Sequence, residues 1–199
     1  SITMLYSNMD KAELLEKVSE QIKNCRKCEL WKTRNKPVPG EGNPNSKIML
    51  IGLGPGKQED LEGRPFVGPA GKFLDELIGI VGLRRQQVFI TNVMKCFLPD
   101  NQATEHQIEL CTPYLDKQIE IIKPKLIVTL GNIATNYILK KFGLSVQPIS
   151  KIHGEVFEVN TLIGKIKIIP MYHPASALYN PGMRQILIED WESIQQFLR

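Results

Sequence analysis

The four cysteines of this chain are spaced as a close pair and a distant pair. Cys25 and Cys28 form a Cys-x2-Cys motif, whereas Cys96 and Cys111 lie far downstream with fourteen residues between them. Because a Cys-x2-Cys turn points two sulfurs toward one point, four thiolates in this arrangement can converge on a metal centre. A zinc ion, an iron–sulfur cluster and two disulfides all fit the pattern. The cysteines alone favour zinc slightly, and disulfides come last because they need an oxidising compartment.

A second group of chemically capable residues lies elsewhere in the chain. The run Gly52-Leu-Gly-Pro-Gly56 has three glycines in five residues, so backbone amides can approach a ligand closely, although a plain tight turn is an equal reading. It has the spacing of neither a phosphate loop nor a dinucleotide fingerprint. Asn92 can cap a turn or read a nucleobase edge. His173 can be structural or can donate a hydrogen bond as a neutral imidazole. Phe66 stands in a loop rich in glycine and proline, which makes it a candidate stacking platform.

The patterning of apolar residues predicts the elements that must position these groups. Short apolar runs predict strands at 47–52, 88–91 and 125–130, and a hairpin around 160–164 whose second arm joins the sheet. Helical spacing predicts helices at 10–23, 71–82 and 104–122, another from 131 through 140, and a last one at 183–198. The segment 36–46 is rich in turn formers and predicts a loop leading into the first strand.

Strands that alternate with helices predict an α/β fold with three α/β/α layers and a central, mainly parallel sheet of about four strands. In such sheets a ligand binds beyond the carboxyl ends of the strands. The glycine run follows the first predicted strand, Asn92 the second, Gly131-Asn132 the third and His173 the last. We therefore expect these groups to meet in one crevice.

Size and composition limit the classes of protein that the chain can be. Its 199 residues predict a single domain, 1–199, with a full hydrophobic core. A net charge of +4 and a pI near 8.8 permit a polyanionic partner without requiring one. No secretory signal is evident, and no stretch reaches the roughly 20 apolar residues of a membrane span. We therefore expect a cytoplasmic protein that makes no membrane contact.

Together, these motifs resemble those of the family 4 uracil-DNA glycosylases. The run from Gly52 to Gly71 reads G-x-G-P-G-x-x-E-D-x-x-G-R-P-F-V-G-P-A-G and resembles the first motif of that family. Thr91-Asn92 resembles its base-reading strand end, and His173-Pro-Ala-Ser176 resembles its second motif. The four cysteines match its 4Fe–4S ligand pattern in order and approximate spacing, so the resemblance spans nearly the whole chain, from Cys25 to at least Asn180.

The resemblance implies a monofunctional glycosylase that removes uracil from DNA and leaves an abasic site, the first step of base-excision repair. Members of this superfamily flip the target base into a tight pocket. Carried over to this chain, Phe66 would stack on the uracil, and Asn92 would pair with its O4/N3 edge and reject cytosine. His173 would donate to O2 of the leaving uracil, while Gly52 and Gly54 would let backbone groups approach the base.

One position departs from the family pattern. Family 4 usually reads G-E-A-P-G at the glycine turn, and its glutamate is thought to position or activate the attacking water, whereas this chain has Leu53 there and Gly54 after it. Glu59 is the nearest acid in sequence that can take over this task. A neighbouring family 5 also has leucine at this position, but its downstream motifs differ from those of this chain.

The resemblance also implies a cofactor and partners. The resemblance favours an iron–sulfur cluster over zinc. A structural 4Fe–4S cluster on Cys25, Cys28, Cys96 and Cys111 would staple the N-terminal segment to the core. Uracil-containing DNA, single- and double-stranded, is the expected partner of a monomer, and a sliding clamp is a further candidate. Leu178, with Tyr179, would fill the gap left by the flipped base, and Ser176 and Arg184 would contact phosphates. A cytoplasmic, nucleoid-associated prokaryotic protein would fit this role.

Two other functions compete with this one. Leu53 favours a DNA-binding relative with weak or no glycosylase activity, which would bind DNA in a salt-sensitive way without turnover. A zinc-stapled α/β protein with another ligand is the third alternative. A brown chromophore would exclude it, because zinc thiolates are colourless in the visible range.

Overall fold

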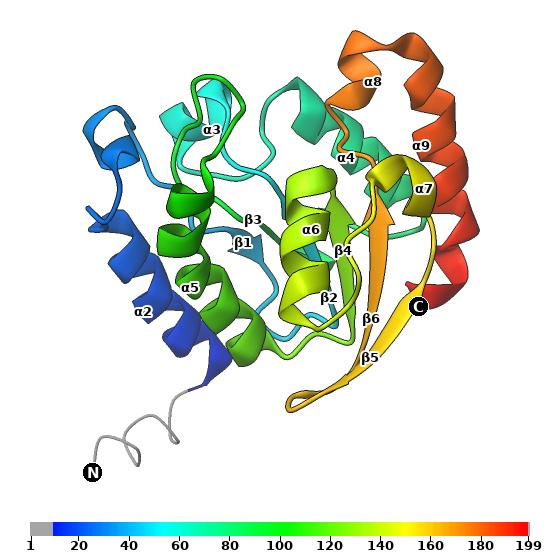
Figure 1. Cartoon of the computed structure of the whole chain (residues 1–199), viewed down its shortest axis with the longest axis horizontal. Coiled ribbons are helices and arrows are strands. Elements are labelled where there is room, and N and C mark those ends of the chain that lie inside the picture. Colours follow the sequence, from blue (N-terminus) through cyan, green and yellow to red (C-terminus); the bar gives the residue numbers. More distant parts are fainter. Residues whose placement is uncertain (1–9, 199) are drawn as a thin grey trace.

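The computed structural model describes residues 10–198, so residues 1–9 and 199 of the predicted domain lie outside the described residues. One sheet of six strands crosses the molecule in the order β1-β3-β2-β4-β6-β5 (Figure 1). The strands are β1 (Glu41–Gly42), β2 (Ile48–Gly52), β3 (Phe89–Asn92), β4 (Leu126–Leu130), β5 (Phe157–Thr161) and β6 (Gly164–Met171). The inner four strands pair in parallel, and β1 and β5 pair antiparallel at the two edges.

Helices cover both faces of this sheet, as the predicted three-layer fold requires (Figure 1). One face carries α2 (Lys11–Lys23), α5 (Glu105–Ile122) and α6 (Asn132–Lys141), and the other carries α4 (Pro69–Ile80) and α9 (Pro181–Ser193). Alternate residues of a strand point to opposite faces, so Met49 and Ile51 of β2 enter the first core while Ile48 and Leu50 enter the second. Within residues 10–198, no helix is long and apolar enough to cross a membrane.

The central parallel strands and the five long helices confirm the expectations from sequence. Their ends differ by a few residues: α4 begins at Pro69, because proline suits the first turn of a helix. The last helix ends at Ser193, where a 3-10 turn, η3 (Gln195–Phe197), replaces the predicted continuation to 198. Short elements without apolar periodicity were not predicted, namely α3 (Lys57–Glu62), α7 (Ile149–Ile152), α8 (Ser176–Tyr179), η1 (Glu29–Lys32) and η2 (Arg85–Gln87).

The sheet is wider than the four predicted strands, and the expectation of a plain loop at 36–46 was wrong at Glu41–Gly42. These two residues form β1, with Glu41 paired to Ile90 of β3. A two-residue strand of glutamate and glycine has no apolar alternation to reveal it. Tertiary contacts hold it instead, because the Glu41 carboxylate forms ion pairs with Arg64 and Arg85, each at 2.9 Å.

The parallel register brings the predicted functional segments to one edge of the sheet. Gly52 at the end of β2 pairs with Asn92 at the end of β3, and Leu130 of β4 pairs with Met171 of β6. The glycine run, Asn92 and the segment that leads to His173 therefore leave the sheet side by side, as the strand-end argument predicts.

Candidate active site and cysteine site

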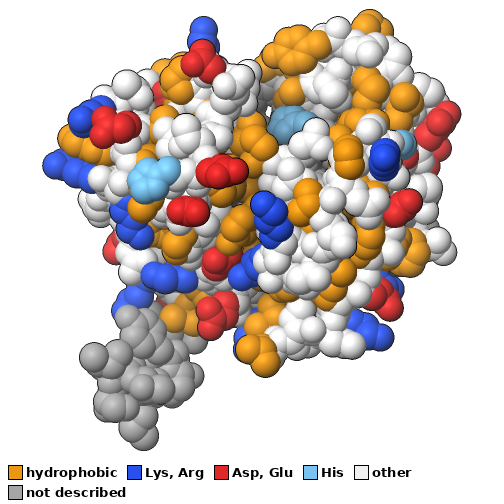
Figure 2. Space-filling model, in the orientation of Figure 1, with side chains coloured by type: hydrophobic (Ala, Val, Ile, Leu, Met, Phe, Trp, Pro, Cys, Tyr) orange, Lys and Arg blue, Asp and Glu red, His pale blue; other side chains and the backbone are white. Residues whose placement is uncertain are grey.

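A cleft of about 580 Å³ opens at the carboxyl ends of the parallel strands. Figure 2 shows the surface hollowed between the side of the molecule that carries α3 and the side that carries α8. Several residues expected from the sequence line the cleft: Leu53, Gly54, Glu59, Phe66, Asn92, His173, Leu178 and Tyr179. Asn101, which the sequence did not single out, also lines it.

Asn92 ends β3 and is the most deeply buried polar group of the cleft, with only 1% of its surface exposed. Its side-chain oxygen Oδ1 is buried and accepts no hydrogen bond from any residue that the structure describes. Gly52 lies beside it in register, and a Cβ atom at Gly52 would stand 2.6 Å from Asn92 Oδ1 and 2.6 Å from the Phe66 ring. Gly52 therefore keeps the space next to the amide open.

Phe66 and His173 form one wall of the cleft from opposite ends of the chain. Their rings stack with centroids 5.5 Å apart and planes inclined by 27°. Phe66 has a φ of 50°, an uncommon conformation for a bulky residue. Arg85 Nη1 donates to the Phe66 carbonyl oxygen at 2.9 Å. Gly71 packs closely against the same carbonyl, because a Cβ atom added at Gly71 would stand only 1.9 Å from the oxygen. The ring is thus fixed by its backbone before any ligand arrives.

The tautomer of His173 follows from one hydrogen bond. The backbone N–H of Ala175 donates to His173 Nδ1 at 3.0 Å, so the proton of a neutral ring resides on Nε2. Burial lowers the pKa of His173 to about 4, and the nearby Glu59 carboxylate only partly opposes this shift. At neutral pH His173 is therefore an uncharged hydrogen-bond donor in the wall of the cleft.

Glu59 is held by backbone amides on both sides. Its Oε1 accepts from the N–H of Gly56 at 3.0 Å, and its Oε2 accepts from the N–H groups of Val67 and Gly68 at 2.9 and 2.7 Å. These bonds join the start of α3 to the loop that carries Phe66. A carboxylate has about four acceptor sites, so three of them are used within the protein. The sequence placed Glu59 near the site but gave no sign of this clamp.

The four residues expected to contact DNA divide into two kinds. Leu178 and Tyr179 lie on α8 at the cleft, with 48% and 81% of their surfaces exposed. Ser176 Oγ instead donates to the carbonyl oxygen of His173 at 2.7 Å. Arg184 pairs with Glu76 at 2.6 Å and covers the Phe73 ring. Phosphate contacts by Ser176 and Arg184 stay predictions.

Leu53 lines the cleft directly after β2, where the family pattern places a glutamate. It is half-buried and packs against the core under α2 and α5. Its side chain has no polar atom that can orient water. Among the described residues that line the cleft, the acid is Glu59, whose carboxylate is bonded to three backbone amides.

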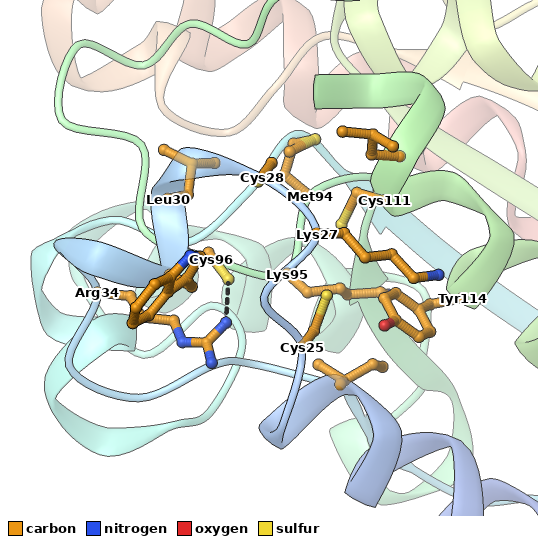
Figure 3. A pocket seen from close by; sticks show the side chains of 13 residues that line it. Cys25, Lys27, Cys28, Leu30, Arg34, Met94, Lys95, Cys96, Cys111 and Tyr114 are labelled. Carbon is orange, nitrogen blue, oxygen red and sulfur yellow. Dashed lines mark hydrogen bonds between the residues drawn. The ribbon is translucent and has the colours of Figure 1, made fainter. Parts of the chain in front are cut away.

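The four cysteines line one small pocket, beside α2 and α5 (Figure 3). Cys96 and Cys111 are buried, whereas Cys25 and Cys28 are half-buried. Arg34 Nη1 donates to Cys96 Sγ at 3.2 Å. Burial raises the pKa of Cys111 to about 11, and Lys95 opposes the shift. Burial likewise raises the pKa of Cys96, and the bond from Arg34 opposes it.

The donor set of the cysteine site is all thiol. Four thiols and no carboxylate of residues 10–198 line the pocket, a set that suits an iron–sulfur cluster and also a zinc ion. No group of three or more His, Cys, Asp or Glu side chains in the described part of the chain is arranged to hold a metal ion. The pocket is distinct from the cleft, since Met94 and Lys95 line it whereas Asn92 lines the cleft.

Comparison with known proteins agrees with this geometry. The model of the uracil DNA glycosylase superfamily matches residues 39–195. The chain belongs to this superfamily. Within it, the chain is 50% identical over 184 residues to the type-4 uracil-DNA glycosylase of Sulfurisphaera tokodaii, which covers 92% of this chain and 84% of that relative. It is 47% identical over 186 residues to the type-4 enzyme of Saccharolobus solfataricus (92% and 86%).

The same comparisons separate the type-4 from the type-5 group. The chain is 29% identical over 176 residues to the type-5 uracil-DNA glycosylase of Pyrobaculum aerophilum, which covers 81% of this chain and 75% of that relative. The chain is therefore a member of the type-4 family, despite the leucine at position 53. This confirms the resemblance that the GRPFVGPAG segment and the cysteines carry.

The contact between Gly71 and Phe66 predicts that two alanine substitutions in α4 have opposite effects on stability. Gly71→Ala places a Cβ against the Phe66 carbonyl and should lower the free energy of unfolding by about 1–3 kcal/mol. Gly79→Ala is the matched control, because no described atom lies within 4 Å of a Cβ added there. Alanine suits the interior of a helix better than glycine, so this substitution should stabilise the protein by about 0.5–1 kcal/mol. Denaturant unfolding measures both, and equal midpoints for Gly71→Ala and the unsubstituted protein would contradict the close approach.

Proposed function

We propose that this chain hydrolyses the N-glycosidic bond of deoxyuridine in DNA, releasing uracil and leaving an abasic site. The observation that carries the proposal is the buried Oδ1 of Asn92, an acceptor without a donor at the cleft. Its type-4 relatives, which are named uracil-DNA glycosylases, support the same activity.

The amide of Asn92 distinguishes uracil from cytosine by the direction of its hydrogen bonds. Uracil offers an N3–H donor for Oδ1 and an O4 acceptor for the Nδ2 amide. Cytosine offers an N3 acceptor and an N4 donor at the same places, so both contacts become repulsive. Leaving a buried polar group unpaired costs about 1–3 kcal/mol. Asn92 therefore penalises the normal base and favours the deaminated one.

The target base must leave the duplex to reach this amide, because its Watson–Crick edge is paired inside DNA. Phe66 then supplies a flat apolar surface for stacking, held in place by Gly71 and Arg85. Exposed Leu178 and Tyr179 at the rim of the cleft are placed to occupy the gap in the helix. The basic net charge favours binding to the DNA backbone.

Bond cleavage leaves negative charge on uracil O2, and His173 stabilises it. The ring is neutral with its proton on Nε2, so it donates a hydrogen bond without adding a charge to be desolvated. Removing one such preorganised donor costs about 3 kcal/mol in other enzymes. Backbone amides near Gly54 contribute further donors in this proposal. Glu59 holds the loop of Phe66, and its remaining acceptor site is available to the attacking water.

Cys25, Cys28, Cys96 and Cys111 would hold a 4Fe–4S cluster in this proposal, supported by the all-thiol pocket. Such a cluster would be structural and would tie the segment before β1 to the residues after β3 and to α5. It would supply no step of the hydrolysis, which the residues of the cleft perform in this proposal. The sliding-clamp partner and the monomeric state stay predictions.

The direct test is uracil release from a labelled duplex with one U·G pair, using anaerobically purified protein of verified iron content. We expect uracil release and an alkali-labile site, and Asn92→Asp should lower the rate at least tenfold, because a carboxylate lacks the Nδ2 donor. Asn45→Asp, at an exposed asparagine, is the matched control and should keep the rate. An iron-loaded protein that binds DNA without releasing uracil would overturn the proposal in favour of a binding function.

A second prediction concerns the water. Leu53→Glu restores a carboxylate at the cleft and should raise kcat several-fold if Leu53 limits the positioning of water. Leu61→Glu, at a leucine exposed on α3, controls for the added charge and should change kcat little. A fall in kcat for Leu53→Glu would show that the pocket is built around the leucine, since that side chain also packs on the core.

The pH dependence follows from His173. Its neutral form is the donor, so kcat/KM should be constant from about pH 8 to pH 5 and fall as the pH drops through about 4. An unfolded histidine takes up a proton near pH 6.5 while the folded one does so only near pH 4, so stability is also lost as the pH falls across this interval. His106→Gln, on the exposed surface, should keep the wild-type profile. An acid limb near pH 6.5 would contradict a neutral buried donor.

A further inference from the structure

The side-chain amine of Lys95 is buried, and its hydrogen-bond partners are all neutral. Burial lowers the pKa of Lys95 to about 7. Only 1% of its surface is exposed. Its Nζ donates to Thr91 Oγ1 at 2.5 Å, to Gln118 Oε1 at 2.7 Å and to the carbonyl oxygen of Pro39 at 3.3 Å. Burying an ammonium group without a charged partner is costly, so its retention requires a specific reason.

The partners of Lys95 belong to three segments that meet around the cysteine pocket. Thr91 lies on β3, directly before Asn92, and Gln118 lies on α5, two turns beyond Cys111. Pro39 belongs to the loop between the Cys-x2-Cys motif and β1. The carbonyl oxygen of Pro39 also accepts from Thr91 Oγ1 and Gln118 Nε2, each at 2.8 Å, so the three segments share one acceptor.

Lys95 itself is the residue between the two sites. It precedes Cys96 and lines the cysteine pocket, as Figure 3 shows. Its side chain reaches back four residues to Thr91, so the stretch from Thr91 to Lys95 forms a closed loop that ends directly before Cys96. Backbone bonds add to this loop: the N–H of Val93 donates to Gly52 O at 2.9 Å, and the N–H of Val38 donates to Lys95 O at 2.7 Å.

Lys95 also meets the cysteine pocket through its main chain. It lines the pocket together with Cys111, and its backbone N–H interacts with the Cys111 sulfur. Its side chain bonds to the strand that carries Asn92. Lys95 thus contacts both the cysteine pocket and the base-binding strand.

We propose that Lys95 is a positioning residue that joins the cysteine site to the base-binding end of β3. Through Thr91 it fixes the backbone that presents the Asn92 amide, and through Gln118 and Pro39 it holds α5 and the loop after the Cys-x2-Cys motif around the cysteine site. The cysteine site then affects the cleft through the short stretch 91–96, without contributing a group to it. The inference rests on the proposed function in taking Asn92 as the group that binds the base and the four cysteines as ligands of a cluster.

The test compares three variants in the purified iron-containing protein. Lys95→Met removes all three bonds of the amine. Thr91→Val removes the bond from Lys95 to β3 together with the bond from Thr91 Oγ1 to the Pro39 carbonyl, and leaves the bonds from Lys95 to Gln118 and Pro39. Lys117→Met is the matched control, because it makes the same substitution at an exposed lysine on α5, next to Gln118. The readouts are amide hydrogen exchange at residues 89–96, the rate of iron loss to a chelator, and kcat and KM on uracil-containing DNA.

In Lys95→Met we expect the amide hydrogens of residues 89–96 to exchange at least tenfold faster and iron to be lost about 10–100-fold faster. We expect kcat to fall by a larger factor than KM changes. Thr91→Val should show the faster exchange and the lower kcat but retain iron at the wild-type rate. Lys117→Met should match the wild type in all three. If Lys95→Met does not fold, Thr91→Val alone decides, because it is nearly isosteric.

Wild-type exchange and kcat in Thr91→Val, or wild-type iron retention in Lys95→Met, would overturn the proposal. Its failure is separable from failure of the proposed function, since hydrogen exchange requires no turnover. A wild-type protein that releases no uracil would refute the activity and leave the exchange comparison intact. A wild-type protein without iron would refute the proposed cofactor and, with it, the role of Lys95 at the cysteine site.

Discussion

A buried carbonyl oxygen without a donor costs a folded protein about 1–3 kcal/mol, and this chain keeps one at Asn92 Oδ1. The surrounding structure explains how that oxygen stays available. The parallel register of β2 and β3 sets Gly52 beside it, and the absence of a side chain at Gly52 leaves room for a flat ring. The unpaired oxygen is thus a feature that the sheet holds in place for a ligand.

The other groups of the cleft are fixed in the same way, by bonds that exist before any base is bound. Glu59 ties two loops through three backbone amides, and Ala175 sets the tautomer of His173. Because these bonds form on folding, the proposed mechanism needs no reorganisation when charge develops on the leaving base. In this proposal catalysis consists of stabilising the leaving group with neutral donors, which is consistent with a leucine at position 53.

Much of this arrangement could be predicted from the sequence, because it depends on local pattern. Apolar runs revealed the parallel strands, and the strand-end rule then placed Asn92 and His173 in one crevice. The cysteine spacing indicated a four-thiolate site, and the GRPFVGPAG segment identified the family. These signals need only the order of residues along the chain.

The rest depends on contacts between distant residues, which spacing does not encode. The two-residue strand β1 exists because Arg64 and Arg85 hold Glu41. Arg184 seemed free for phosphate in the sequence, yet it is paired with Glu76. Nothing in the sequence singles out Lys95, and the packing of α5 and the Pro39 loop against β3 buries it.

The measurement that tests the central claim most directly compares excision of deoxyuridine with excision of 3-methyldeoxyuridine from the same single-stranded oligonucleotide. Methylation of N3 removes the donor that Asn92 Oδ1 is proposed to receive and changes no other hydrogen-bonding group of the base. The account predicts that the methylated base is excised at least a hundredfold more slowly, and that this difference largely disappears in an Asn92→Ala variant. Equal excision of the two bases by the unsubstituted protein would show that the buried oxygen of Asn92 does not read uracil.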